Sequence, residues 1–263
     1  MKYSLIFSLV MTISSPVFTQ STQITGHDYV ELSQEFLNRM RAGEDASEIV
    51  DKYAKIDFNA LVEAVDERTE KLAFWINTYN GFVQYLLVND PSLFEDRRSF
   101  YFDKRVNIAG IKMSFDDIEH GIIRDSRVKL GLGFLKKWFV PKYERMLRVD
   151  DRDGRVHFAL NCGAKSCPPV AIYDDQFIYA QLDEITESYL KKETVVEKNK
   201  VTTSILFSWF RGDFGGKKGI KQFLKKYGII ESTKGVEVHF GNYDWTLSTG
   251  NYTDFQKASP TVK

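Results

Sequence analysis

Apolar residues recur at helical spacing along much of the chain. The pattern predicts helices over residues 27–41, around 59–65, and over 67–88, 175–192 and 218–227. The longest, Glu67–Val88, is apolar nearly all round in its C-terminal half, which is typical of a buried central helix. Pro91 ends it, because a residue before proline is pushed out of the helical region.

Other segments alternate with the period of a strand. Residues 102–114 predict paired strands that turn near Ala109-Gly110, residues 195–207 predict a hairpin, and residues 236–240 predict a closing strand. Arg155 to about Asn161 reads as a strand that enters a loop. We therefore expect one α+β domain over residues 20–263, in which a mixed or antiparallel sheet packs against the long buried helix and several shorter helices.

The first residues predict a signal peptide. Lys2 supplies the positive start, Leu5–Ile13 the short apolar core, and cleavage is expected near Thr19 or Gln20. A buried strand or helix is the alternative, whereas a retained anchor would need a longer run, of about 20 apolar residues. Residues 1–19 therefore predict export to the periplasm or the cell exterior.

Composition narrows the classes of function. The 263 residues are 43% hydrophobic, which excludes a disordered chain, and 36 basic residues balance 36 acidic ones. We therefore expect no nucleic-acid partner. No transmembrane segment is expected, since no other segment could cross a bilayer. No cofactor is expected either, and the sequence has no nucleotide-binding glycine loop and no G-x-S-x-G motif. The expected partner is a small molecule or a peptide.

Arg155–Val170 holds both cysteines of the chain. Cys162 is the better candidate for a nucleophile, since it ends the predicted strand and the following backbone N–H groups are available to an oxyanion. Cys167 ranks second because it precedes Pro168, which has no N–H. In an oxidising compartment the same pair predicts a disulfide. A zinc site formed with two histidines is a weaker alternative, and no metal site is expected.

Two histidines are candidates for the catalytic base. His120 lies on a helix that Ser114 and Asp117 open as a capping box, with Glu119 beside it to orient the ring. His157 is held in reserve, because on a strand it would point away from the thiol of Cys162. The structural alternatives are an ion pair of His120 with a neighbouring carboxylate and a hydrogen-bonded sheet histidine at position 157.

Amide side chains interrupt the apolar surface of the central helix. Asn77, Asn80 and Gln84 are spaced i, i+3 and i+7, so they share one face. They either hydrogen-bond neighbouring backbone or line a pocket, since buried amides need partners. With Asn161 and Arg124 they form the predicted ligand-binding set.

Four segments together resemble the family known as domain of unknown function 547. They are Ala73–Asn80, Phe115–Arg124, Val156–Val170 and Tyr243–Leu247. The resemblance covers about residues 61–247 and implies an exported bacterial protein of unknown activity. A weaker likeness to the papain and transglutaminase thiol enzymes implies a thiol chemistry, although no cysteine of this chain opens a long helix as in papain.

Two hypotheses follow. The first is a cysteine-dependent hydrolase or acyl-transferase acting on an amide or thioester, with Cys162 as nucleophile. The second is a non-catalytic exported binding module shaped by a Cys162–Cys167 disulfide.

Overall fold

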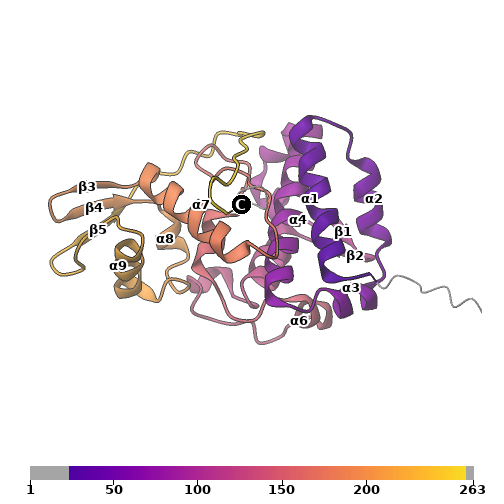
Figure 1. The fold of residues 1–263 in the computed structure, drawn as a ribbon, viewed down its shortest axis with the longest axis horizontal. Coiled ribbons are helices and arrows are strands. Elements are labelled where there is room, and N and C mark those ends of the chain that lie inside the picture. The colour runs from indigo at the N-terminus through magenta and orange to yellow at the C-terminus, as the bar shows by residue number, and fades with distance from the viewer. Residues whose placement is uncertain (1–23, 259–263) are drawn as a thin grey trace, which may run out of the picture.

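A computed structural model describes residues 24–258 of the chain, and the predicted signal peptide lies outside these residues. Figure 1 shows the N-terminal helices at one end of the molecule and a small sheet with helix α9 (Gly216–Lys226) at the other. Helix α7 (Ile178–Glu193) lies between them. Within residues 24–258, no helix is both long and apolar enough to cross a bilayer.

Helix α4 (Arg68–Asn89) forms the centre of the helical end and confirms the predicted long helix. Fourteen of its residues are buried, including every residue from Leu72 to Gln84. It packs against α1 (Gly26–Ala42), and a β-carbon at Gly81 would lie 2.6 Å from the ring of Phe36 on α1. The absence of a side chain at Gly81 therefore sets how closely the two helices approach.

The strands form two small sheets, one near each end of the molecule (Figure 1). Strands β1 (Val106–Ile108) and β2 (Ile111–Met113) are antiparallel and turn at Ala109-Gly110, where both residues have positive φ. In the second sheet, β3 (Val195–Glu197) pairs antiparallel with β4 (Lys200–Thr203), and β5 (Glu237–Phe240) pairs parallel with β4. The α+β class is confirmed.

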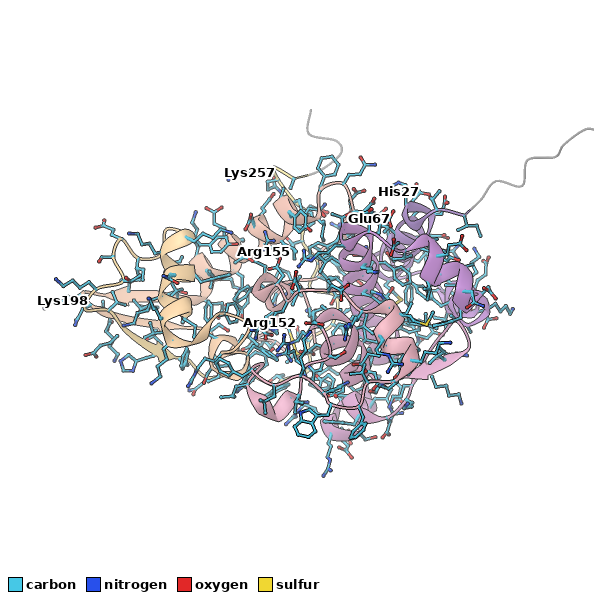
Figure 2. The ribbon with its side chains drawn as sticks, turned by 90° about the horizontal axis from the view of Figure 1, so that it is seen from below. His27, Glu67, Arg152, Arg155, Lys198 and Lys257 are labelled. Atoms are coloured by element: carbon cyan, nitrogen blue, oxygen red, sulfur yellow. A yellow bond between two sulfur atoms is a disulfide. The ribbon has the colours of Figure 1, made fainter. Side chains whose placement is uncertain are left out.

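The remaining elements are short helices and helical turns. They are α2 (Ser47–Lys55), α3 (Phe58–Ala64), η1 (Pro91–Phe94), α5 (Arg97–Phe102), η2 (Asp117–Ile123), η3 (Lys129–Gly131), α6 (Lys142–Leu147), η4 (Gly154–Phe158) and α8 (Leu206–Trp209). Arg152 lies in the middle of the molecule in Figure 2, while Lys198 lies at the far tip of the β3–β4 turn. Arg152 donates to the carbonyls of Gly133 and Gly212, both at 2.8 Å, and so joins distant loops.

The predicted strand from Arg155 to Asn161 is wrong. Residues Gly154–Phe158 form the 3-10 helix η4, which Asp153 caps by accepting from the N–H of Arg155 at 3.0 Å. Every residue from Val156 to Asn161 is buried, so the apparent alternation does not mark one buried and one exposed face. The turn of η4 also invalidates the argument that His157 must point away from Cys162.

The C-terminal segment returns to the loop that follows η4. Ser248 N–H donates to the carbonyl of Gly163 at 2.8 Å, and Lys165 N–H donates to the carbonyl of Thr246 at 2.8 Å. This pairing places residues 244–248 against the cysteine loop.

Candidate functional site

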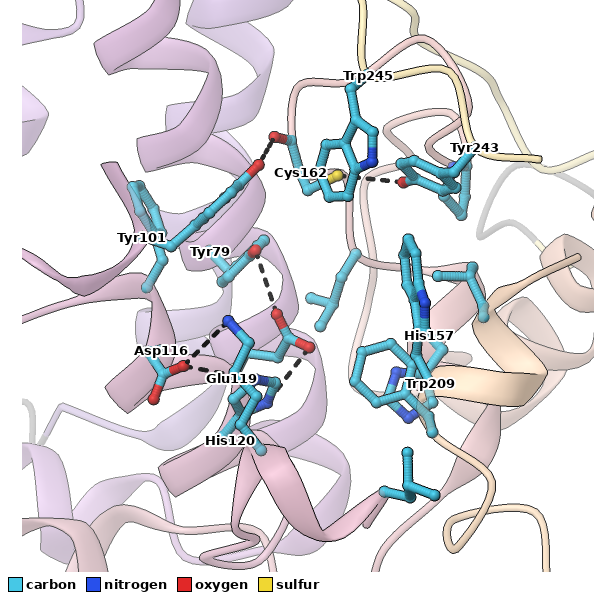
Figure 3. A pocket seen from close by; sticks show the side chains of 17 residues that line it. Tyr79, Tyr101, Asp116, Glu119, His120, His157, Cys162, Trp209, Tyr243 and Trp245 are labelled. Atoms are coloured by element: carbon cyan, nitrogen blue, oxygen red, sulfur yellow. Dashed lines mark hydrogen bonds and ion pairs between the residues drawn. The ribbon is translucent and has the colours of Figure 1, made fainter. Parts of the chain in front are cut away.

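A cavity of about 490 Å³ lies where α4, η2, the cysteine loop, α8 and the C-terminal segment meet (Figure 3). Seven aromatic side chains line it: Tyr79, Tyr101, Phe115, Trp209, Phe210, Tyr243 and Trp245. Its acidic and basic lining residues are Asp116, Glu119, His120, Lys129 and His157, and Cys162 also lines it. The structure therefore brings together Cys162, Glu119, His120 and His157, all of which were predicted as site residues.

The indoles and a phenol form one wall of the cavity. Trp209 and Trp245 stack with ring centres 5.8 Å apart and an interplanar angle of 25°. Tyr243 lies against both, with ring centres 5.0 Å from Trp209 and 4.7 Å from Trp245. Aromatic groups of this kind offer a large and rigid apolar surface to a ligand.

A disulfide joins Cys162 and Cys167, as the second hypothesis predicted. Cys162 lines the cavity, whereas Cys167 is 5% exposed. The hydroxyl of Tyr243 lies 3.2 Å from the sulfur of Cys162 and 3.1 Å from that of Cys167. Cys162 is thus the half of the disulfide that forms part of the cavity wall, and both sulfurs lie beside the hydroxyl of Tyr243.

The acidic end of the cavity is built by η2, a π-helical turn. Ser114 and Asp117 open it as the predicted capping box, with N–H to oxygen distances of 2.9 and 3.0 Å. The wider hydrogen-bond pattern, from the N–H of Arg124 to the carbonyl of Glu119 at 3.0 Å, places Glu119 and His120 in the cavity wall together. Such turns are frequent at functional sites.

His120 is a hydrogen-bond donor toward the cavity. Its Nδ1 lies 2.7 Å from a guanidinium nitrogen of Arg124, and because a guanidinium only donates, Nδ1 accepts. The proton of the neutral ring then sits on Nε2, which faces a carboxylate oxygen of Asp116 at 3.6 Å. Burial and the charge of Arg124 hold the pKa of His120 well below its usual value of 6.5, which keeps the ring neutral.

Glu119 shares this end of the cavity. The hydroxyl of Tyr79 donates to its Oε2 at 3.4 Å, while its Oε1 lies 3.4 Å from Nδ1 of His120, an atom that carries no proton. Burial raises the pKa of Glu119, and the charge of Arg124 partly opposes that shift. Among the described residues no hydrogen bond reaches Oε1, so this oxygen is free to accept one from a ligand.

His157 and Asp213 form a buried dyad. Nε2 of His157 donates to Oδ2 of Asp213 at 2.8 Å, and Nε of Arg124 donates to the same oxygen at 2.7 Å. His157 also stacks on Phe210, with ring centres 3.7 Å apart. Burial lowers the pKa of His157 to about 4, despite the opposing bond to Asp213. Burial raises the pKa of Asp213, but His157 and Arg124 outweigh it and hold that pKa well below 3.8.

Asp213 is a residue that the sequence analysis missed. It lies in the turn after α8, to which the sequence assigned no chemistry, and no spacing rule links it to His157. The aromatic residues around it, among them Phe210 and Phe214, could have identified Asp213 as a buried charge, because a charge inside an apolar turn needs a partner. Arg124 supplies that partner from behind the cavity, and it is not itself a lining residue.

The predicted amide set lies behind the cavity wall, where it holds backbone. Asn77 bonds the N–H and the carbonyl of Tyr173 at 2.9 and 2.8 Å. Asn80 bonds the carbonyl of Ala159 at 2.9 Å and the N–H of Asn161 at 2.8 Å. These contacts fix the chain segments that lead into and out of the cysteine loop.

The other two amides fasten the loop itself. The side-chain Nδ2 of Asn161 donates to the backbone carbonyl of Pro168 at 2.7 Å, and its Oδ1 accepts from the N–H of Gly163 at 3.0 Å. Gln84 donates to the same oxygen at 3.3 Å and accepts from the N–H of Gly250 at 2.9 Å. The predicted alternative of backbone support describes these contacts, and none of the four amides lines the cavity.

Comparison with known proteins gives one match. Residues 63–190 match the model of a family described as "Protein of unknown function, DUF547". No curated protein and no solved structure matches the chain, so the likeness to papain and transglutaminase enzymes receives no support. The matched residues include the cysteine loop and the η2 turn but end before Trp209, Asp213, Tyr243 and Trp245.

Proposed function

Because residues 63–190 belong to the DUF547 family, whose activity is unknown, we propose a function from the site itself. The chain binds a small molecule that has a planar, largely apolar body and an amine. The observation that carries this proposal is the cavity of about 490 Å³, which has seven aromatic lining residues and carboxylates at one end. Its volume falls within the ~300–1,000 Å³ typical of small-molecule sites. The proposal retains the export expected from residues 1–19.

The charges at the acidic end favour an amine over a carboxylate. Lys129 lies 3.6 Å from Asp116 and neutralises it, and His120 is neutral. Glu119 is then left as the charge that faces the cavity, with Oε1 lacking a donor among the described residues. An ammonium group would supply that donor, and the aromatic rings would attract the same cation through their faces.

The binding proposal can be tested with two probes that share a phenyl ring. Binding of 2-phenylethylamine and of 3-phenylpropionate would be measured by calorimetry and by the fluorescence of Trp209 and Trp245. We expect the amine to bind at least about tenfold more tightly, since a charge-assisted hydrogen bond is worth more than the ~1.4 kcal/mol that this ratio represents. Equal affinity, tighter binding of the acid, or no binding of either probe would overturn the proposal.

A matched pair of variants tests whether Glu119 causes the preference for the amine. Glu119→Gln keeps the shape of the side chain but removes its charge, so the preference for the amine should disappear. Glu63→Gln removes a charge from an exposed residue of α3 and should leave both affinities unchanged.

A thiol hydrolase or acyl-transferase is the second candidate function, and the His157–Asp213 dyad favours it. The dyad resembles the base and orienting carboxylate of a hydrolase, and His157 lines the same cavity as Cys162. The reaction needs a free thiolate, so the disulfide must first be reduced. We expect hydrolysis of a phenylacetyl thioester only by the reduced chain, and none by Cys162→Ser although its fold is intact. Hydrolysis by Cys162→Ser would exclude this role.

A further inference from the structure

The two sulfurs of the disulfide have different surroundings. Cys162 lines the cavity and is partly exposed, so a molecule inside the cavity can reach its sulfur. Cys167 is 5% exposed and does not line the cavity. A nucleophile that enters the cavity therefore meets the sulfur of Cys162 first.

Cys167, the sulfur that the cavity does not reach, has more hydrogen-bond donors around it than Cys162. The sulfur of Cys167 lies 3.1 Å from the backbone nitrogen of Cys162 and 3.3 Å from that of Ala164, and both N–H groups point at it. The hydroxyl of Tyr243 adds a third donor at 3.1 Å. Against these three, the sulfur of Cys162 has only the shared hydroxyl, at 3.2 Å, among the described residues.

Donors of this kind stabilise negative charge that develops during a reaction. A neutral sulfur in a disulfide is a weak acceptor, whereas a thiolate is a strong one, so the three contacts strengthen as Cys167 takes up an electron pair. They are already in place before the bond breaks, so little reorganisation is needed. The surroundings thus fit Cys167 as a leaving group and Cys162 as the atom that is attacked.

We propose that the chain is a thiol–disulfide oxidoreductase whose substrate is a small thiol that enters the cavity. The thiol loses its proton to solvent, and its thiolate attacks the sulfur of Cys162. The Cys162–Cys167 bond breaks, its electron pair leaves on Cys167, and a mixed disulfide forms at Cys162. A second thiolate then attacks the mixed disulfide, and both cysteine thiolates take up protons. Two thiols are oxidised to one disulfide, and the protein disulfide is reduced to a dithiol.

The first test identifies which sulfur is attacked. The oxidised full chain would be mixed with 2-mercaptoethanol, quenched with acid, alkylated and mapped by mass spectrometry. This probe has no amine, so the result does not depend on the binding role proposed for Glu119. We expect the adduct on Cys162 and the alkyl group on Cys167, with at least about tenfold selectivity, equivalent to ~1.4 kcal/mol. In urea, where the surroundings are lost, the selectivity should fall toward one.

A matched pair of tyrosine variants tests the donors. Tyr243→Phe removes one of the three donors, and we expect disulfide opening to slow about tenfold while the adduct stays on Cys162. Tyr252→Phe changes another tyrosine of the same segment, which does not line the cavity, and should react at the parent rate. The unfolding midpoint of both variants would be measured to separate this effect from a loss of fold.

Three results would overturn the proposal. They are an adduct on Cys167, an equal mixture in the folded chain, or an unchanged opening rate in Tyr243→Phe. Loss of amine binding with retained selectivity would refute the binding role alone, and retained binding without selectivity would refute the redox role alone.

Discussion

Replacing Asn80 with alanine should destabilise the whole fold, although this side chain touches no ligand. Asn80 is completely buried and bonds two backbone groups that lie 79 and 81 residues away, the carbonyl of Ala159 and the N–H of Asn161. The alanine variant leaves both groups buried without partners. Each unsatisfied group costs about 1–3 kcal/mol, so we expect a loss of about 2–6 kcal/mol in the free energy of unfolding.

The assay is urea denaturation followed by circular dichroism, with Asn89→Ala as the control. Asn89 ends the same helix, is exposed, and bonds only the carbonyl of Tyr85 one turn away. Its replacement should change the free energy of unfolding by less than about 0.5 kcal/mol. A loss below about 1 kcal/mol for Asn80→Ala would show that this amide does not hold the cysteine loop, and backbone support would then be the wrong role for the helix amides.

Three further predictions concern the loop and the buried charges. Gly163→Ala should lower the free energy of unfolding by about 1–3 kcal/mol or more, since Gly163 has φ +86° and a β-carbon would lie 2.4 Å from a side-chain carbon of Leu87. A thermal melt like that of the parent would contradict this. Asp213→Ala should cost about 3–5 kcal/mol, because it leaves Arg124 buried without its carboxylate, and Arg124→Met in the same background should recover part of that loss. The free energy of unfolding should fall as the pH drops from about 6.5 toward 4. The pKa of His157 is lowered to about 4 in the folded chain, so the unfolded chain takes up a proton on this residue first. Urea titrations at pH 7.5 and 5 measure this decline, which should be smaller for His157→Gln.

The elements that the sequence predicted well are those with local signals. Helix α4 follows from a long apolar pattern and a proline that ends it, and the start of η2 follows from the capping residues Ser114 and Asp117. The segment after Arg155 was assigned to a strand because its residues favour strands. A 3-10 helix that is buried on all sides contains the same apolar residue types as a buried strand, so the sequence pattern alone does not distinguish a strand from a 3-10 helix here.

The site was predictable in its chemistry but not in its assembly. Cys162, Glu119, His120 and His157 were identified as candidates, and all four line one cavity. The part of the wall that Tyr243 and Trp245 form depends on the pairing of the C-terminal segment with the cysteine loop, which no local pattern reveals. The partnership of Asp213 with His157 likewise arises from residues 56 positions apart.

The pairing of the C-terminal segment also sets the order in which the site is completed during synthesis. A ribosome makes the chain from its N-terminus, so the cysteine loop and η2 emerge well before Tyr243 and Trp245. The two cysteines are five positions apart, so their bond can form before the covering segment exists. If the bond forms at that stage, Tyr243 and Trp245 close over a loop that is already oxidised. A nascent chain truncated after residue 190 would carry the whole matched family region and yet leave this disulfide uncovered.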